Sequence, residues 1–228
     1  MGIMQNIPLF PLGTVLFPKQ YLPLHIFEER YNLMIGECLR DKSHFGVVLI
    51  RAGREAGGPA IPFEMGTTAR IVDMQSLEGG RMNIKTIGER PFRITRITQE
   101  RPYMRADVEY IEYTAGAAKD VQESVRAVRQ GFEVHLDLLA ALSNRERVNL
   151  DLNVEPEGLS LLVASVMAID NQEKQELLKI TSAGERLTKE ASILARENRT
   201  LQTFLFLKQR AKNDKPSDGD TTIRISPN

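Results

Sequence analysis

The side chains that most often ligate metals or act as nucleophiles are few in this sequence and lie far apart. The 228 residues include three histidines, His25, His44 and His135, and a single cysteine, Cys38. Their separations do not match metal-binding motifs, and one cysteine excludes an internal disulfide, a CxxC pair and a multi-cysteine zinc site. We therefore expect no bound metal and no cofactor, and we interpret Cys38 as a core residue.

The motifs of the common enzyme classes are missing as well. No GK dipeptide occurs, which excludes a P-loop, and HExxH, GxSxG and GxGxxG are absent. Glu28 and Glu29 lie where a helix should begin, and Asp107 and Glu109 lie on the solvent face of a predicted strand, so we interpret both pairs as solvated rather than as acid–base pairs. We expect a protein that is not an enzyme, with an unrecognised hydrolase as the least favoured alternative.

One stretch has the composition of a nucleic-acid contact. "RPFRITRITQERPYMR", residues 90–105, interleaves five arginines with Phe92 and Tyr103, as surfaces that bind single-stranded RNA do. Residues 90–112 also hold four acidic side chains, so five positive charges against four negative ones leave only +1. RNA binding is therefore the alternative function, and nucleic acid is disfavoured as a partner. The candidate RNA-binding residues are Arg93, Arg96, Arg101 and Arg105.

Charge and hydropathy narrow the remaining partners. Thirty Lys and Arg residues balance 30 Asp and Glu residues, so no global field attracts nucleic acid or anionic lipid. Residues 1–18 are uncharged but are interrupted by prolines and lack a basic start, and the uncharged run 158–169 is shorter than the about 20 residues of a membrane span. We expect a soluble, cytoplasmic protein without a membrane partner.

Up to about residue 115 the sequence is typical of short strands separated by Gly and Pro. "FGVVLI" predicts a buried strand, "TARIVDMQSL" and "RMNIKTIG" flank a hairpin turn at 78–80, and "FRITRIT" and "YMRADVEYIEY" predict two more strands. "RAGREAGGPAIP" is interpreted as a loop, and the opening "IPLFPLGTVLFP" as a strand with prolines at its edges or a strand and turn. With one helix at 28–42, this half should form a small closed or nearly closed sheet.

After about residue 115 the apolar pattern changes to that of packed helices. Apolar residues recur every three or four positions from Val121 to Leu142, with His135 the only polar member, and a similar pattern continues for some 29 residues in the last predicted helix. The predicted starts of the later helices are Pro156, Asp170 with Glu173, and Ser182 with Glu185. We predict an α+β protein with a β-rich domain at 1–115, a helical bundle at 116–211 and a disordered tail at 212–228.

Several quoted blocks together resemble one known family. "PLFPLGTVLFPKQYLPLHIFEERY", followed by "FGVVLI", "GTTARI" and "GERPFRI", is similar to the amino-terminal substrate-binding domain of the Lon protease family. The resemblance continues in "MAIDNQEKQELLKITSAGERLTKEASIL" and covers about residues 7–207. Two residues depart from the family pattern: Lys19 stands where a Gly commonly follows "FP", and Pro91 stands where an Arg commonly precedes "FRI".

The resemblance implies a PUA-like β-domain and a domain without catalytic residues of its own. In that family an ATPase and a Ser–Lys peptidase module follow, and this chain ends before either, so it is similar to a free-standing Lon amino-terminal domain. The partner implied is a polypeptide segment or a protein, which includes a separate ATP-dependent protease; the sequence specifies neither the partner's identity nor the oligomeric state.

The leading hypothesis is therefore a non-catalytic binding module that accepts an unfolded or extended segment in an apolar groove or along a sheet edge. Few apolar residues lie outside the predicted core pattern, and methionine suits contacts with varied partners. The same residues could instead fill the β-core. The candidate binding residues are Phe63, Met65, Met74 and Met82.

Overall fold

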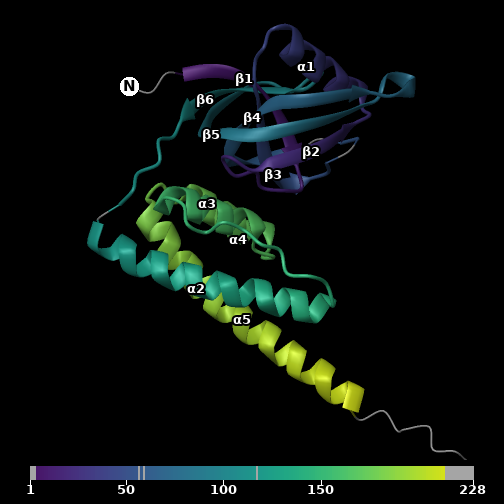
Figure 1. Cartoon of the computed structure of the whole chain (residues 1–228). Helices are drawn as coiled ribbons and strands as arrows, with labels where there is room; N and C mark the ends of the chain where they lie inside the picture. The colour runs from purple at the N-terminus through teal and green to yellow at the C-terminus, as the bar shows by residue number, and fades with distance from the viewer. Residues whose placement is uncertain (1–3, 56, 59, 117, 214–228) are drawn as a thin grey trace, which may run out of the picture.

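A computed structural model describes residues 4–55, 57–58, 60–116 and 118–213 (Figure 1). The predicted tail lies outside the described residues from position 214 onward. The strands are β1 (Met4–Leu12), β2 (Tyr21–Ile26), β3 (Phe45–Gly53), β4 (Ala60–Ser76), β5 (Met82–Gln99) and β6 (Met104–Tyr110). The helices are α1 (Glu29–Arg40), α2 (Ala118–Ser143), α3 (Pro156–Val166), α4 (Asn171–Lys179) and α5 (Ala183–Asn213), with a 3₁₀ turn (Glu78–Gly80) between β4 and β5.

The six strands form one sheet that closes on itself. Their order is β2-β5-β4-β3-β1-β6, and β6 also pairs with β5, which joins the two ends of the β5–β4–β3–β1–β6 series. The closure is possible because β5 is long: residues 82–87 pair with β2, and residues 92–99 pair with β6. The predicted closed sheet and the α+β class are confirmed.

The sequence interpretation divided β5 wrongly. The sequence predicts "RMNIKTIG" and "FRITRIT" as separate strands, but the chain passes through Gly88 and Pro91 without leaving the sheet. At this junction the pairing with β4 shifts register, between Thr67 opposite Pro91 and Ala69 opposite Gly88. The end of the predicted loop, Ala60–Pro62, also belongs to a strand, since β4 begins at Ala60.

Two prolines of the opening, Pro8 and Pro11, lie inside β1, in positions where they disturb few hydrogen bonds. Residues 4–9 pair with β6 and residues 9–12 pair with β3, so each half of β1 has one partner. Pro8 therefore sits in a half-strand without a β3 partner, and Pro11 in one without a β6 partner. This arrangement explains how a strand between two neighbours tolerates two prolines.

Helix α1 packs on the side of the sheet that faces away from the other helices (Figure 1). Its predicted apolar stripe is buried at Tyr31, Met34, Ile35 and Cys38, but the two outer members of the prediction, Phe27 and Leu39, are exposed. The interpretation of Cys38 as a core residue is confirmed, and burial raises the pKa of its thiol.

The other four helices lie together on the opposite side, with α5 packed along α2 (Figure 1). The predicted N-cap of α4 is confirmed, because the Asp170 carboxylate accepts from the Glu173 N–H at 2.8 Å, while the Glu173 carboxylate pairs with Arg196 instead of completing a capping box. His135, the polar member of the α2 stripe, is buried and its Nδ1 lies 2.9 Å from Asn198 Oδ1 on α5.

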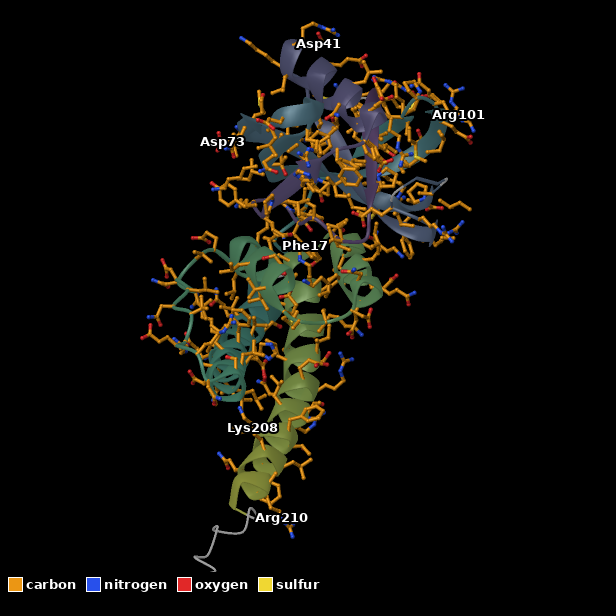
Figure 2. The ribbon with its side chains drawn as sticks, turned by 90° about the vertical axis from the view of Figure 1, so that its right-hand side faces the viewer. Phe17, Asp41, Asp73, Arg101, Lys208 and Arg210 are labelled. Atoms are coloured by element: carbon orange, nitrogen blue, oxygen red, sulfur yellow. The ribbon has the colours of Figure 1, made fainter. Side chains whose placement is uncertain are left out.

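The sheet and the helices share an apolar core. Phe17, Leu49 and Met65 of the sheet half belong to the same buried cluster as Phe132 and Leu159 of the helices, and Figure 2 shows Phe17 between the two parts. Hydrogen bonds add to this contact, from Gln175 Nε2 to Met65 O at 3.0 Å and from Asn171 Nδ2 to Gly13 O at 2.6 Å. The domain boundary near residue 115 stays a prediction.

Candidate functional site: a groove where the sheet meets the helices

The four apolar residues nominated from the sequence lie in two separate places. Met65 is 3% exposed in the core between sheet and helices, and Phe63 is partly buried against the same core. Met74 is 43% exposed near the β4–β5 hairpin, and Met82 packs against the core under α1. Nine positions of strand separate Met65 from Met74, which is roughly 30 Å at the usual rise. The structure does not bring the four together into one surface.

The nominated arginines lie among acidic and amide partners. Arg96 is opposite Asp107 in the β5–β6 ladder and forms an ion pair with it at 2.7 Å, and Arg93 is opposite Glu109. Arg105 donates to the Asn6 side chain at 2.8 Å. Asp107 has a pKa held below its usual value by hydrogen bonds from Asn6 and Arg96. Because carboxylates neutralise this strip, it offers little net charge to phosphates. Arg101 lies apart, at the loop before β6.

A groove lies where the turn before β2 faces the start of α3. Its volume is about 830 Å³, which is within the range of typical ligand pockets. Its lining comes from two segments that are more than 130 positions apart in the sequence. The lining residues are Pro18, Lys19, Gln20 and Tyr21 on one wall, and Asn153, Val154, Glu155, Glu157, Gly158, Leu161, Leu162 and Ser165 on the other.

The first wall is a tight turn held against β5. Lys19 N–H donates to Gly88 O at 2.7 Å, and Gly88 N–H donates to Gln20 O at 2.9 Å. A Cβ at position 88 would lie 2.2 Å from Phe17 O, so only glycine permits this approach. Lys19 has a φ of 67°, in the left-handed region, which accounts physically for the Gly expected at this position in the family resemblance.

The second wall is held by a cation from α2. Arg129 Nε donates to Leu152 O at 3.0 Å, and its Nη2 donates to Val154 O at 3.2 Å, so one guanidinium fixes the segment before α3. Pro156 then begins α3 at a position where the missing N–H costs nothing. Arg129 therefore positions this wall from outside the groove lining.

The groove has an apolar floor and a polar rim. Leu161 is buried at its base and Leu162 is partly buried, while Tyr21 is 56% exposed on the opposite wall, with Lys85 Nζ 4.6 Å from its ring centroid. Among the described residues, the rim carboxylates of Glu155 and Glu157 form no salt bridge. Such a surface can take up apolar side chains and orient a segment through a few polar contacts.

The sheet edge beside the groove is partly blocked. In the described chain β2 pairs only with β5, so its outer side is an edge. Because Gly88 N–H donates to Gln20 O, alternation directs the backbone of Leu22 and Leu24 toward β5 and that of Pro23 outward. Pro23 has no N–H to offer an added strand, and proline on an edge commonly prevents strand addition.

Sequence reasoning missed the groove because neither wall has a motif. The one local signal was Lys19, singled out as a departure from the family pattern, which lies in the wall itself. No group of three or more His, Cys, Asp or Glu residues in the described ranges could hold a metal ion. None of the described helices is both long enough and apolar enough to cross a bilayer.

Comparison with known families matches most of the chain to one family model. The model of the ATP-dependent protease La (LON) substrate-binding domain matches residues 6–196. Among curated proteins, the Lon protease of Azospirillum brasilense is 25% identical over 207 residues, which cover 90% of this chain and 26% of the relative. Lon protease 2 of Bdellovibrio bacteriovorus is 29% identical over 220 residues, covering 94% of this chain and 27% of the relative. The chain thus spans about a quarter of the length of these relatives.

Two solved structures share the fold. A Lon N-terminal domain protein from Xanthomonas campestris superposes with a TM-score of 0.62 at 22% identity, covering 81% of this chain and 96% of that one. The N-terminal domain of a Mycobacterium avium complex Lon protease gives a TM-score of 0.65 at 15% identity, covering 84% and 98%. The agreement includes both the sheet and the helices, since four fifths of the chain is aligned.

Proposed function

Because the chain belongs to the family of the Lon protease substrate-binding domain, we propose that it is a non-enzymatic module that captures extended polypeptide segments in the groove between the turn Pro18–Tyr21 and α3. Membership of this family supports a substrate-binding module. We further propose that the groove is the binding site, that the ligand is extended and that the module has no catalytic activity. The relatives carry the name of a protease, but this chain spans about a quarter of their length.

The observation that carries the proposal is the composition of the groove. A volume of about 830 Å³ accommodates several side chains of a peptide, and the floor at Leu161 and Leu162 is apolar. Tyr21 stands exposed on the opposite wall, where an aromatic ring can cover a captured side chain at a low cost in entropy. The groove therefore suits an extended segment that carries apolar side chains.

Capture by side chains fits this site better than addition of a strand. Pro23 interrupts the outer row of β2 donors, so backbone pairing along the edge would be incomplete. Affinity then comes from apolar burial in a single groove and should be weak unless several copies act on one substrate. Binding through apolar contacts should also change little with salt, unlike binding to phosphates.

The proposal can be tested by filling the groove without disturbing the fold. Gly158 lines the groove within helix α3, and a Cβ there would meet Val154 at 3.7 Å, which is ordinary contact. Gly158→Leu should raise helix propensity by up to about 1 kcal/mol while occupying the groove. Gly36→Leu on the exposed side of α1, where a Cβ meets nothing within 4 Å, is the matched control.

Binding is measured with a fluorescent, permanently unfolded carboxymethylated model protein. We expect Gly158→Leu to weaken its binding by about tenfold or more, a loss of about 1.4 kcal/mol, and Gly36→Leu to leave it unchanged. Equal binding by both variants would remove the groove from the site. Purified wild-type protein should show no peptidase activity, and turnover that survives purification would contradict a non-enzymatic module.

A further inference from the structure

The second half of α5 carries apolar side chains that the other described helices leave exposed. In the first half Leu187 and Leu194 are 0% and 1% exposed, whereas Phe204 and Leu207 are 58% and 53% exposed. Helix α2 ends beside Lys208, whose Nζ donates to Leu142 O at 2.6 Å. Figure 1 shows α5 running on past the end of α2, and Figure 2 shows Lys208 and Arg210 toward its free end.

Phe204 and Leu207 belong to a continuous stripe of α5 whose other members are small residues. Thr200 and Thr203 lie on the same side of the helix, since residues three and four apart are neighbours. Their hydroxyls donate to the carbonyls four positions earlier, Thr200 to Arg196 O at 3.2 Å and Thr203 to Arg199 O at 3.0 Å. Because the hydroxyls are satisfied within the helix, the threonine methyl groups can face outward beside the two large side chains.

Small residues around two large ones make a surface on which another helix can pack. Helices that pack through such ridges and grooves lie about 8–10 Å apart, at a distance that depends on the side chains at the contact. Phe206, 62% exposed, points to the other side of α5, about 200° around the helix from Phe204. The apolar residues thus do not form the single wide face with which a helix lies in a bilayer surface.

The charge of this segment selects the partner. From Asn198 to Asn213 the sequence contains no Asp or Glu and has four basic residues, Arg199, Lys208, Arg210 and Lys212. Two copies of the segment would bring basic residues against basic residues, which disfavours self-association. A partner with acidic residues beside its apolar stripe would gain both burial and charge complementarity.

We propose that the stripe Thr200, Thr203, Phe204 and Leu207 docks an amphipathic helix of another protein whose polar residues are acidic. This surface lies on the free half of α5, away from the groove at the junction of sheet and helices, and shares no residue with it. The protein would then hold a substrate segment in the groove and a helical partner on α5.

The test uses the full chain and a synthetic helical peptide of about 18 residues with Leu at every third or fourth position and Glu elsewhere. A control peptide carries Lys in place of Glu. Fluorescence anisotropy should show saturable binding of the Glu peptide, weaker at high salt, and no binding of the Lys peptide. Phe204→Ser with Leu207→Ser should weaken binding by about tenfold or more, and Phe206→Ser should change it by less than about threefold.

Each alternative occupant gives a result that overturns the proposal. Equal binding of the two peptides, or no binding of the Glu peptide at about 1 mM, contradicts an acidic helical partner. Sedimentation that shows a dimer dissociated by the double substitution would assign the stripe to a second copy. Co-sedimentation with anionic phosphatidylglycerol vesicles, lost in the double variant, would assign it to lipid. An unchanged melting temperature verifies that both variants are folded.

Discussion

The sheet half and the helical half of the molecule are tightly packed by different means. In the sheet half, backbones approach so closely that a Cβ on Gly66 would lie 2.4 Å from Val47 O, and one on Gly88 would lie 2.2 Å from Phe17 O. In the helical half, the side chains of Arg186 and Glu190 are completely buried. The sheet half should therefore lose stability when atoms are added to its glycines, and the helical half should lose stability when a buried polar side chain is removed.

The buried polar side chains of the helical half form one connected cluster. Arg186 Nε donates to Ser160 Oγ at 2.6 Å, and Ser160 Oγ donates to Glu190 Oε1 at 2.7 Å. The guanidinium also donates to Ile180 O at 2.7 Å and lies 4.5 Å from the centre of the Tyr113 ring. The cluster thus joins α3, α5 and the segment that follows β6, which makes Arg186 the side chain whose loss should do most damage.

The largest effect is expected from removing Arg186. Arg186→Met should lower the free energy of unfolding by about 3–5 kcal/mol, because it removes the buried donor to Ser160 Oγ and Ile180 O and the only cation of this cluster. The double variant Arg186→Met with Glu190→Leu should recover part of the loss, since the buried Glu190 carboxyl is then removed as well. Urea denaturation of the three proteins measures this, and a double variant less stable than Arg186→Met would contradict the assigned coupling.

The next effect is expected in the sheet half. Gly88→Ala forces a methyl group against the Phe17 carbonyl and should cost about 1–3 kcal/mol through the backbone shift that follows. Because the displaced turn is a wall of the groove, substrate binding should weaken as well. Gly36→Ala, at a position with open space, is the control and should be neutral or slightly stabilising. A Gly88→Ala protein with wild-type stability would show that the close approach is not required.

In the helical half, stability should also depend on pH through the buried carboxyl of Glu190. Burial raises the pKa of Glu190 well above its ordinary value of 4.5, so folding takes up a proton that the unfolded chain releases. Stability from this group is complete below about pH 4.5 and falls as pH rises through the folded pKa, by at most about 1.4 kcal/mol per pH unit. Glu190→Gln should lose this slope in denaturation series, and exposed Glu185→Gln should keep it. Identical slopes would show that Glu190 does not titrate in this way.

The smallest effect concerns Lys19. A lysine in the left-handed conformation costs about 1 kcal/mol or more. Glycine removes this strain, but the greater freedom of its unfolded chain offsets part of the gain in stability. Lys19→Gly should therefore stabilise by about 0.5 kcal/mol, whereas Lys19→Ala should give no gain because it keeps the strained backbone. Thermal melting of both variants checks the sign, and an equal gain from alanine would attribute the effect to the side chain instead.

The sequence was sufficient for the local elements and insufficient for the groove. Helix α4 could be predicted because Asp170 and Glu173 form a cap within four residues, and α1 because its apolar stripe has a helical period. The continuity of β5 could not be predicted, since Gly88 and Pro91 are residues typical of a strand end. Only their pairing with β4 keeps these residues in the sheet. Met65 appeared available because local sequence does not reveal the helices that cover it.

The groove itself depends on an approach between distant segments. Tyr21 and Gly158 become neighbours only after the core around Phe17 has joined the sheet to the helices. Neither wall has a motif, and the contact that holds the second wall comes from Arg129, outside the lining. No local pattern could report this arrangement.

The central claim is that substrate segments contact the groove, and photo-crosslinking tests it most directly. A photoreactive phenylalanine analogue is placed at Tyr21, in the groove wall, or at Met74, which is 43% exposed near the distant hairpin. The protein is then irradiated with the unfolded model substrate. We predict crosslinks from position 21 that Gly158→Leu abolishes, and few from position 74. Crosslinks from position 74 but not from position 21 would contradict the assignment of the groove.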